Sequence, residues 1–460
     1  MKALILGANG PAHALVWKLF NSDRLDHIVS SPGNGGAGIL APIVAAKETV
    51  AATVQWAYEE SFRLIVPATP EPLQEGLVEE ATSMRIAAWG PPKQSALLTK
   101  SRLWAKEFLN RYQLPTAPGK AFGDFATAER YLASQSLPVL LWGDYPSEFD
   151  GAYMDRAAVM KALAGIFALP PRPDHFRGVV IEAPVVGPSV SCSCITDGAT
   201  ALPLLPVRIY ERLEDGDRGW AAPGMGGHTS PSPLLAKIGD YIQRQILQPL
   251  LAALQRENLP WWGVLGVDCV IASDGPKVTQ IRCTLGDPEA QVLLPRLEDD
   301  LFSLIVATNN RNLQSLPPLR WKPGASVGVG LVAQGYPHNF PTGLALNGVS
   351  DLEAGVLAFQ SETTNPFSMN YVPDSHELLG GGYGGGYGGS LITGFADSLS
   401  SAMLVRESGP TRLTTHGGKP VLVVAQGQTL AEARQRAYAN LERLTLRPSF
   451  HRTDIGAQDL

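Results

Sequence analysis

Two short glycine-rich loops near the N-terminus have the composition best suited to binding an anion. Gly7-Ala8-Asn9-Gly10 joins an expected strand to an expected helix, and Ser31-Pro32-Gly33-Asn34-Gly35-Gly36 follows the next expected strand. Glycines let backbone amides approach a phosphate, and the positive end of a helix favours negative charge. Loops at neighbouring strand ends of an α/β sheet share one crevice. The pair predicts a site for a small phosphorylated metabolite, although a tight turn that binds nothing fits the first loop equally well.

Two further segments could carry chemistry. Asp215-Gly216-Asp217 precedes Pro223-Gly224-Met225-Gly226-Gly227, which together form either a substrate loop with two carboxylates or a polar surface loop. Gly286-Asp287-Pro288-Glu289 could bind a ligand or cap the next helix. The histidines at 13, 228 and 451 have no carboxylate or serine at a catalytic spacing, which favours structural roles. The first loop lacks the GxGxxG spacing, which argues against a nicotinamide-dependent oxidoreductase.

Composition excludes several classes of protein. The 460 residues carry a formal net charge of −6, which argues against a general nucleic-acid binder because phosphates need a basic face. No apolar run approaches the roughly 18 residues of a membrane span. The first apolar stretch breaks at Gly7, so it is a poor signal peptide. Four cysteines without metal-binding spacing favour packed thiols. We expect a cytoplasmic protein with no membrane or nucleic-acid partner.

The hydrophobic pattern predicts the elements that position these loops. Strands at 2–6, 27–30 and 62–66 alternate with helices at 12–20 and 47–60, which indicates a covered parallel sheet. An amphipathic helix at 100–112 follows, then strands at 137–141 and 178–182 around a helix at 157–167. A long helix at 233–258 should kink at Pro249. A hairpin at 263–283, a strand at 326–332, a strand at 420–425 and a helix at 430–444 complete the pattern.

These elements suggest three lobes. We expect an N-terminal α/β domain at 1–100, a middle domain at 101–320 with a smaller subdomain at about 120–187, and a β-rich domain at 321–460. A Gly/Tyr-rich insertion at about 363–412 contains GGGYGGGYGG, which is typical of a flexible segment. It could be a lid, a partner-binding segment or an inert linker.

The quoted loops also carry a family resemblance. MKALILGANGPAHALVWKL, SSPGNGG, PGMGGHTSP and GPKVTQIRCTLGDPEAQVLLPRLEDDL make the sequence similar to glycinamide ribonucleotide synthetase (phosphoribosylamine–glycine ligase), an ATP-grasp enzyme of purine biosynthesis. The resemblance covers almost the whole chain. It implies an α/β and α+β fold of ATP-grasp architecture, with an N-terminal parallel α/β domain and a small β-rich C-terminal domain.

The resemblance also implies site residues. A sugar phosphate would be bound by Gly7, Asn9, Gly10, His13, Gly33, Asn34 and Gly35. The substrate loop would comprise Arg212, Asp215, Asp217, Gly224, Met225, Gly226, Asp287, Pro288 and Glu289. A nucleotide, if one binds, would meet Arg102 and Glu182.

Departures from the family pattern fall on the groups that hold ATP and magnesium. Trp142 stands where the family has a nucleotide-binding lysine, and the carboxylates Glu148 and Asp150 replace a glycine-rich phosphate loop. Gln280 and Arg282 replace the Glu-x-Asn magnesium ligands, a poor set for a cation that prefers carboxylate oxygens. A like charge 4 Å away costs about 4 kcal/mol at an effective dielectric of 20. We therefore predict no metal site.

Further replacements repeat the pattern. Pro11-Ala12 replaces Arg-Glu in the first loop, Arg208-Ile209-Tyr210-Glu211 replaces Gln-Asp-His-Lys, Ala221-Ala222 replaces Asn-Thr, and Ala183 replaces the second hinge carboxylate. The favoured hypothesis is a family homologue that has lost ligase activity and works as a binding or regulatory protein. The alternative is an active ATP-dependent ligase, using glycine and phosphoribosylamine or another carboxylate–amine pair, and only then would ATP and magnesium be cofactors.

Overall fold

The computed structural model describes residues 1–144, 147–170, 176–370 and 413–458. The Gly/Tyr-rich segment GGGYGGGYGG, predicted to be a flexible insertion, lies outside this part, and so does any role for that insertion. Residues 363–370, expected to begin the insertion, instead pair with the N-terminal domain: the Gly35 N–H donates to the Thr363 carbonyl at 2.8 Å. Within the described residues, no helix is long and apolar enough to cross a membrane.

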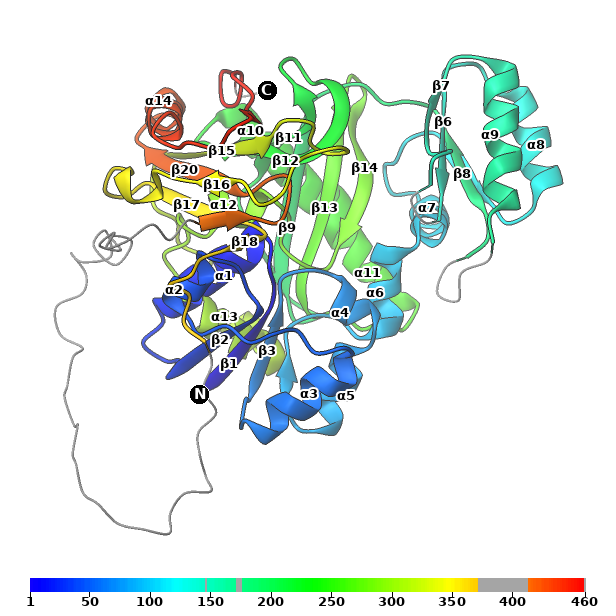
Figure 1. Cartoon of the computed structure of the whole chain (residues 1–460). Helices are drawn as coiled ribbons and strands as arrows, with labels where there is room; N and C mark the ends of the chain where they lie inside the picture. Colours follow the sequence, from blue (N-terminus) through cyan, green and yellow to red (C-terminus); the bar gives the residue numbers. More distant parts are fainter. Residues whose placement is uncertain (145–146, 171–175, 371–412, 459–460) are drawn as a thin grey trace, which may run out of the picture.

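The N-terminal domain contains the predicted parallel sheet, in the strand order β2-β1-β3-β4 (Figure 1). Asn9 caps the first helix by accepting a hydrogen bond from the Ala12 N–H at 3.0 Å, so the helix begins two residues before the expected start. The strands are β1 (Lys2–Gly7), β2 (His27–Pro32), β3 (Leu64–Pro67) and β4 (Ala87–Ala88). The helices are α1 (Gly10–Phe20), α2 (Ala37–Leu40), α3 (Val50–Glu59), α4 (Glu71–Gln74), α5 (Leu77–Ser83) and α6 (Lys93–Lys100).

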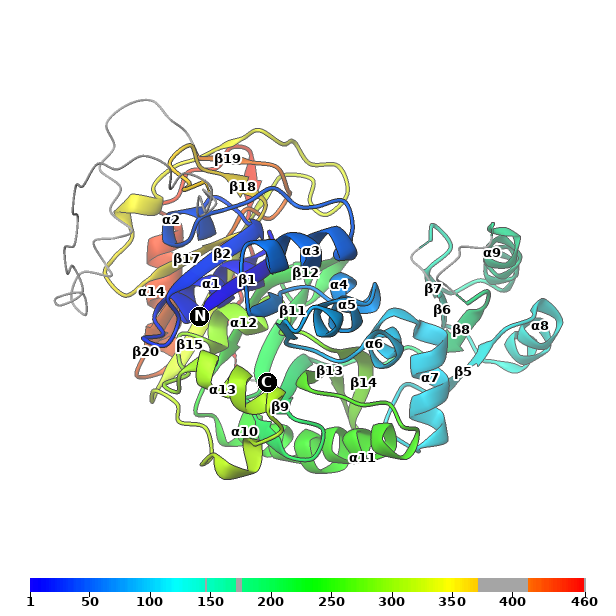
Figure 2. The ribbon, with the colours of Figure 1, turned by 90° about the horizontal axis from the view of Figure 1, so that it is seen from below.

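A smaller lobe stands to one side of the molecule and is reached through α7 (Arg102–Arg111) (Figures 1 and 2). Its antiparallel sheet has the order β5-β8-β6-β7, and two helices cover one face with a core that includes Leu141, Leu163 and Ile181. The elements are β5 (Gly119–Phe122), α8 (Phe125–Ser134), β6 (Val139–Gly143), β7 (Gly151–Tyr153), α9 (Arg156–Ala168) and β8 (Val179–Glu182).

One large antiparallel sheet forms the centre of the molecule, with the path β14-β13-β9-β11-β12-β15-β20-β17. It crosses the expected domain boundary near residue 320, because Gly226 of β12 pairs with Val329 of β15. The strands are β9 (Ser189–Thr196), β10 (Ala201–Pro203), β11 (Val207–Glu214), β12 (Arg218–Thr229), β13 (Gly263–Ala272), β14 (Gly275–Arg282), β15 (Ala325–Ala333), β17 (Leu357–Gln360), β20 (Val421–Gly427) and β21 (Ser449–Phe450).

Short elements and helices surround this sheet. A small sheet has the order β16-β19-β18, and the helix at the C-terminal end packs on β15 and β20. The small strands are β16 (Ala345–Leu346), β18 (Thr363–Thr364) and β19 (Leu413–Thr415). The helices are α10 (Pro233–Ile242), α11 (Gln248–Arg256), α12 (Glu289–Leu293), α13 (Leu301–Asn309) and α14 (Leu430–Leu441), with short 3₁₀ turns at Leu313–Ser315 and Val349–Asp351.

The long helix predicted at 233–258 is interrupted near Pro249, but by a π-helical turn that precedes the proline and not by a kink at the proline itself. A π-helical turn at Gln243–Leu247 separates α10 from α11, and Pro249 lies in the first turn of α11. Proline lacks the N–H that would bond the carbonyl four residues earlier, and a wider turn just before it accommodates that loss. Leu235, Ile242 and Leu250 still face the same core.

Candidate functional site

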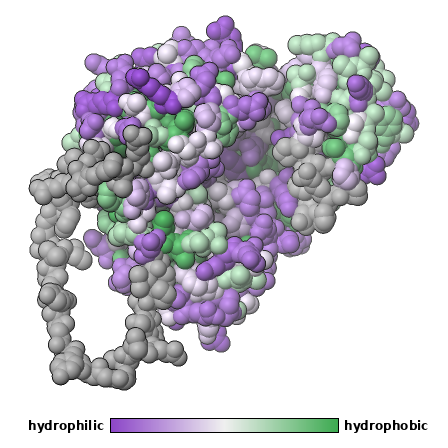
Figure 3. Space-filling view, in the orientation of Figure 1, coloured by the Kyte–Doolittle hydropathy of each residue, from purple (hydrophilic) through white to green (hydrophobic). Residues whose placement is uncertain are grey.

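Two adjoining cavities of about 320 Å³ each lie against β14. We call the first the inner cleft; its lining includes Asn9, Glu211, Asp268, Arg282, Asp287 and Glu289. We call the second the outer cleft, between α7, β8 and β14; its lining includes Arg102, Lys106, Asp144, Glu182 and Thr279. Gln280 lines both. Figure 3 shows a hydrophilic hollow between the main body and the smaller lobe.

Arg282 dominates the inner cleft because every one of its five N–H donors is engaged within the protein. Its Nε lies 3.1 Å from Asp268, and its Nη1 lies 2.6 Å from a Glu289 oxygen and 3.3 Å from the Thr284 carbonyl oxygen. Its Nη2 donates to the hydroxyl oxygens of Ser191 and Ser193. The residue is only 9% exposed. The guanidinium therefore holds the carboxylates together and has no donor left for a ligand.

Burial and charge set the ionisation of the inner cleft. Burial alone would lower the pKa of Arg282, but Asp268 and Glu289 outweigh it and raise that pKa. Burial would raise the pKa of Glu289, yet the Arg282 ion pair and hydrogen bonds bring it below its usual value. Burial raises the pKa of Asp268. Burial, reinforced by Asp268, raises the pKa of Glu211 to about 7. One cation thus faces up to three carboxylates.

The two glycine-rich loops meet side by side, as predicted. The Asn34 amide nitrogen donates to the carbonyl oxygens of Ala8 and Gln360 at 3.0 and 2.9 Å, and its Oδ1 accepts from the Ala37 N–H. This buried side chain therefore ties the loops to β17 rather than reaching a ligand. Gly7 has a φ of 147°, and a Cβ there would lie 3.0 Å from the Ala68 side chain. Of the seven predicted sugar-phosphate residues, Asn9 lines the inner cleft.

His13, also predicted at that site, packs beneath the second loop. Its ring is 1% exposed, and a Cβ on Gly36 would lie 2.1 Å from it, so a glycine is required there. Its Nδ1 accepts a hydrogen bond from the Gln360 N–H at 2.9 Å, which leaves the proton on Nε2. Burial lowers the His13 pKa to about 3, so the ring is neutral at pH 7.

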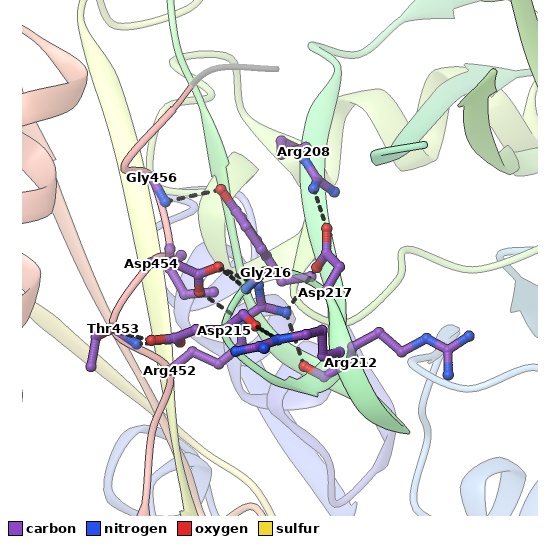
Figure 4. A network of polar contacts seen from close by, with 12 residues as sticks. Arg208, Arg212, Asp215, Gly216, Asp217, Arg452, Thr453, Asp454 and Gly456 are labelled. Atoms are coloured by element: carbon purple, nitrogen blue, oxygen red, sulfur yellow. Dashed lines mark hydrogen bonds and ion pairs between the residues drawn. The ribbon is translucent and has the colours of Figure 1, made fainter. Parts of the chain in front are cut away.

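The predicted substrate loop divides into two parts. Asp215 and Asp217, at the tip of the β11–β12 hairpin, do not line the inner cleft. They contact the C-terminal segment instead (Figure 4). Asp217 pairs with the fully buried Arg452 at 2.8 Å and with Arg208 at 2.7 Å. Asp215 accepts from the Thr453 N–H at 2.8 Å. These carboxylates therefore act as a structural latch, which we call the C-terminal latch.

Other members of the latch complete the network in Figure 4. Arg452 pairs with Asp454 at 2.6 Å and donates to the Arg212 carbonyl oxygen at 3.0 Å, while the Arg212 side chain donates to the Gly219 carbonyl oxygen. Burial would raise the pKa of Asp454, but hydrogen bonds from Arg452 and the Gly216 N–H outweigh it and lower that pKa to about 2.

The second part of the predicted loop does reach the inner cleft region. Gly224 has a φ of 76°, and a Cβ there would lie 1.9 Å from the Lys419 Nζ. Lys419 in turn pairs with Asp287 at 2.5 Å. Met225 is fully buried, and Gly226 sits on β12 against β15. Asp287 precedes the cis-linked Pro288, and the Glu289 oxygens accept from the Gly286 N–H and the Ser193 hydroxyl. The expected helix-capping role is wrong, because Pro288 is the N-cap of α12 and no side chain in the described part of the chain caps that helix.

Comparison with known proteins decides the family. Family models described as the phosphoribosylglycinamide synthetase N domain, ATP-grasp (A) domain and C domain match residues 1–99, 100–290 and 378–458. The phosphoribosylamine–glycine ligase of Allochromatium vinosum is 31% identical over 99% of this chain and 98% of that protein. The chain belongs to the phosphoribosylamine–glycine ligase family.

Other relatives agree with this family and its purine-biosynthesis setting. The trifunctional purine biosynthetic protein adenosine-3 of Gallus gallus is 30% identical over 99% of this chain, which spans 42% of that protein's length. A phosphoribosylamine–glycine ligase structure from Thermotoga maritima superimposes with a TM-score of 0.75 at 20% identity, covering 99% of this chain and 100% of that one. The predicted ATP-grasp architecture is confirmed.

Arg102 and Glu182, the two residues predicted to contact a nucleotide, both line the outer cleft. Glu182 accepts from Lys106 at 2.9 Å and from the Trp142 indole N–H at 3.0 Å, so both of its oxygens are engaged. Arg102 lies over the Trp142 ring at 4.9 Å and pairs with Asp150 at 2.8 Å. The residues that replace the family's phosphate-binding groups therefore form an internal network with the two predicted nucleotide contacts.

Several residues at the two clefts were not predicted from the sequence. Lys419 follows two glycines and precedes a strand, which was a usable signal. Lys106 is 4% exposed and lies in the apolar stripe of α7 with Leu103 and Leu109, an unusual place for a cation. Asp268 sits in the middle of an apolar strand, which was a comparable signal.

Proposed function

We propose that this family member has lost magnesium-dependent ligation and acts by binding a small phosphorylated metabolite. The carrying observation is the fully hydrogen-bonded Arg282 at a position where the family resemblance puts a magnesium ligand. A guanidinium there pairs with the carboxylates of Asp268 and Glu289, so their negative charge is already neutralised within the protein. Removing a buried ion-pair partner typically costs about 3–5 kcal/mol, so a metal would have to displace a strongly held group.

The donor set around Arg282 does not fit magnesium. Mg²⁺ requires near-octahedral oxygen ligands and is usually held by carboxylates and water. The neighbouring family ligand is Gln280, whose side chain brings an amide in place of a carboxylate. Within the described ranges, no group of three or more histidine, cysteine, aspartate or glutamate side chains could hold a metal ion. We therefore derive no step through magnesium or ATP.

The outer cleft supports the same proposal. A nucleotide there would need a cation for its phosphates and a carboxylate for its ribose. Arg102 is already paired with Asp150, whose second oxygen accepts from the Gly143 N–H at 3.0 Å. Glu182 is held by Lys106 and Trp142. Binding a triphosphate would therefore require breaking existing ion pairs and placing the anion beside Asp150.

The binding half of the proposal rests on the N-terminus of α1. This helix of 11 residues begins beside Asn9, and Asn9 and Pro11 both line the inner cleft, so the positive end of the helix dipole lies at this cavity, although Pro11 has no N–H and Asn9 caps the Ala12 N–H. The nearby Asp287 carboxylate is offset by Lys419. We infer that a compact phosphorylated molecule binds at this end of the cavity. Its binding would not require Asp268 or Glu289, the carboxylates that pair with Arg282.

Active ligation is the second candidate, and the comparisons favour it. The relatives named above carry the ligase name, with near-complete coverage of the Allochromatium vinosum protein. Asp287, Glu289 and the glycines of the β12 loop are retained. For this chain to act as a magnesium-dependent ligase, the Arg282 guanidinium would have to move away from Asp268 and Glu289.

A product assay separates the two candidates. The purified full chain would be incubated with ATP, Mg²⁺, glycine and phosphoribosylamine, with the Allochromatium vinosum relative as positive control, and ADP and glycinamide ribonucleotide measured. We expect neither product above the enzyme-free background. Formation of both at a rate within about tenfold of the control would establish the ligase instead.

The binding half has its own test. Calorimetric titration with ribose 5-phosphate should show saturable binding, and ribose without the phosphate should bind at least about tenfold more weakly, since the helix end recognises the anion. Equal affinity for the two sugars, or binding of neither, would overturn this half while leaving the ligation result standing.

A further inference from the structure

A third cavity, of about 390 Å³, lies away from both clefts and shares no lining residue with them. It sits where the end of α11 meets the β9–β10 turn, the segment just before β13 and the second residue after α13. We call it the tryptophan pocket; its lining includes Leu251, Leu254, Asn258, Trp261, Trp262 and Arg311. Its volume is toward the lower end of the range for small-molecule sites.

The walls of this pocket are apolar and already satisfied in their hydrogen bonds. Leu254 and Trp261 are almost fully buried, whereas Trp262 is half-buried. The Trp261 indole N–H donates to the Val264 carbonyl oxygen at 2.9 Å, and that of Trp262 donates to the Ala88 carbonyl oxygen at 3.3 Å. The two rings therefore offer flat apolar surface to a ligand and no polar group.

The pocket is lined by one guanidinium and one carboxylate, and the two groups are engaged differently. Arg311 is exposed at the rim with its guanidinium 5.8 Å from the centre of the Trp262 ring, and its side chain has no ion pair or hydrogen bond within the described residues. The carboxylate of Asp197 is engaged instead by backbone N–H groups of Ala199, Thr200 and Leu313 at 2.8 to 3.0 Å. The N–H donors of Arg311 therefore remain available to a ligand at the rim, whereas the Asp197 oxygens are taken up by backbone N–H groups.

We propose that the tryptophan pocket binds a small aromatic monocarboxylate. The aromatic body would lie against Trp262 and the buried leucines, and the carboxylate would pair with Arg311, which a planar guanidinium can engage through two parallel N–H donors. A single cation and a small volume select against polyphosphates. This inference does not rest on the proposed function, because the pocket uses none of the residues of the two clefts.

Phenylacetate is the probe, with the uncharged isostere phenylacetamide and the ring-free acetate as matched ligands. Calorimetry on the full chain should give a millimolar or tighter Kd for phenylacetate, and both other ligands should bind on the order of fivefold more weakly or worse. Arg311→Gln should weaken phenylacetate by a similar factor and leave phenylacetamide unchanged. Arg311→Lys should recover part of the loss, because it restores the charge.

Arg256→Gln is the control variant, since it removes an exposed arginine of α11 that does not line the pocket. It should leave every affinity unchanged. Equal affinity for phenylacetate and phenylacetamide would overturn the proposal, and so would an Arg311→Gln variant that binds phenylacetate like the wild type. The absence of binding at about 10 mM phenylacetate, a concentration above the expected Kd, would also overturn it.

Discussion

Replacing Arg282 by methionine is the perturbation that bears most directly on the inner cleft. Methionine keeps much of the apolar stem but removes the guanidinium, which lies 2.6 Å from Glu289 and 3.1 Å from Asp268. The variant leaves two buried carboxylates facing one another without their shared cation. Removing one partner from a buried ion pair typically costs about 3–5 kcal/mol. We expect the variant to unfold on the order of 5–10 °C below the wild type at pH 8.

The loss should depend on pH in a defined direction. In the wild type, the depressed pKa of Glu289 stabilises the fold above the unfolded value and that stability is lost as pH falls. Without Arg282, burial raises the pKa of both carboxyl groups above their unfolded values. Their folded forms then take up protons, so the penalty is largest at high pH and shrinks as pH falls. The difference in Tm between variant and wild type should be clearly smaller at pH 5 than at pH 8.

Thermal unfolding followed by fluorescence at pH 5, 6, 7 and 8 measures this difference. Arg320→Met is the matched control, because Arg320 pairs with Asp299 at 2.9 Å on the surface, with 68% of its side chain exposed. That exposed pair should contribute little to stability, because water and salt screen it. The triple variant Arg282→Met, Asp268→Asn, Glu289→Gln should regain much of the lost stability. A penalty equal to that of Arg320→Met and independent of pH would refute the reasoning.

Three further predictions concern other parts of the molecule. Arg452→Met should free the C-terminal segment, so limited proteolysis should cut the β11–β12 hairpin faster than in Arg218→Met, which removes an exposed arginine of the same hairpin; equal cutting rates would contradict the latch. His13 should stay neutral down to pH 5 in an NMR titration that uses free imidazole as reference, because burial lowers its pKa to about 3, and a midpoint above pH 6 would contradict this. Gly224→Ala and Gly343→Ala both place alanine at a φ near 75°, but only the first meets another side chain, so it should lower Tm further; equal losses would exclude the clash.

The local architecture was predictable because it depends on short-range patterns. Hydrophobic periodicity located β1, α1 and β2, and parallel pairing brought their glycine-rich loops together, as Asn34 and Ala8 show. The family resemblance supplied the ATP-grasp architecture and pointed to Arg282 as an anomaly. The sequence pattern could not predict which groups surround Arg282, because Ser191 and Ser193 lie on a strand about ninety positions earlier in the chain.

Contacts between residues far apart in the sequence explain why some predicted site residues have structural partners that were not expected. Asp217 looked like part of a substrate loop, but its partner Arg452 lies 235 positions away and converts the loop into a latch. Lys419 reaches Asp287 across 132 positions. Glu182 is flanked in sequence by apolar residues, so nothing near it announced that Lys106 and Trp142 would occupy its oxygens. Such contacts form only when the folded chain brings distant residues together, so the residues next to them in the sequence do not predict them.

The most direct test of the central claim is calorimetric titration of MgATP into the wild type and into Gln280→Glu, Arg282→Asn, which restores the family's Glu-x-Asn pair. Gln280→Glu alone serves as the control, because it adds a carboxylate and leaves the guanidinium in place. The account predicts no saturable magnesium-dependent binding to the wild type or the control, and only a weak gain of such binding in the double variant, because Asp150 still pairs with Arg102 in the outer cleft. Micromolar, magnesium-dependent binding of ATP to the wild type would contradict it.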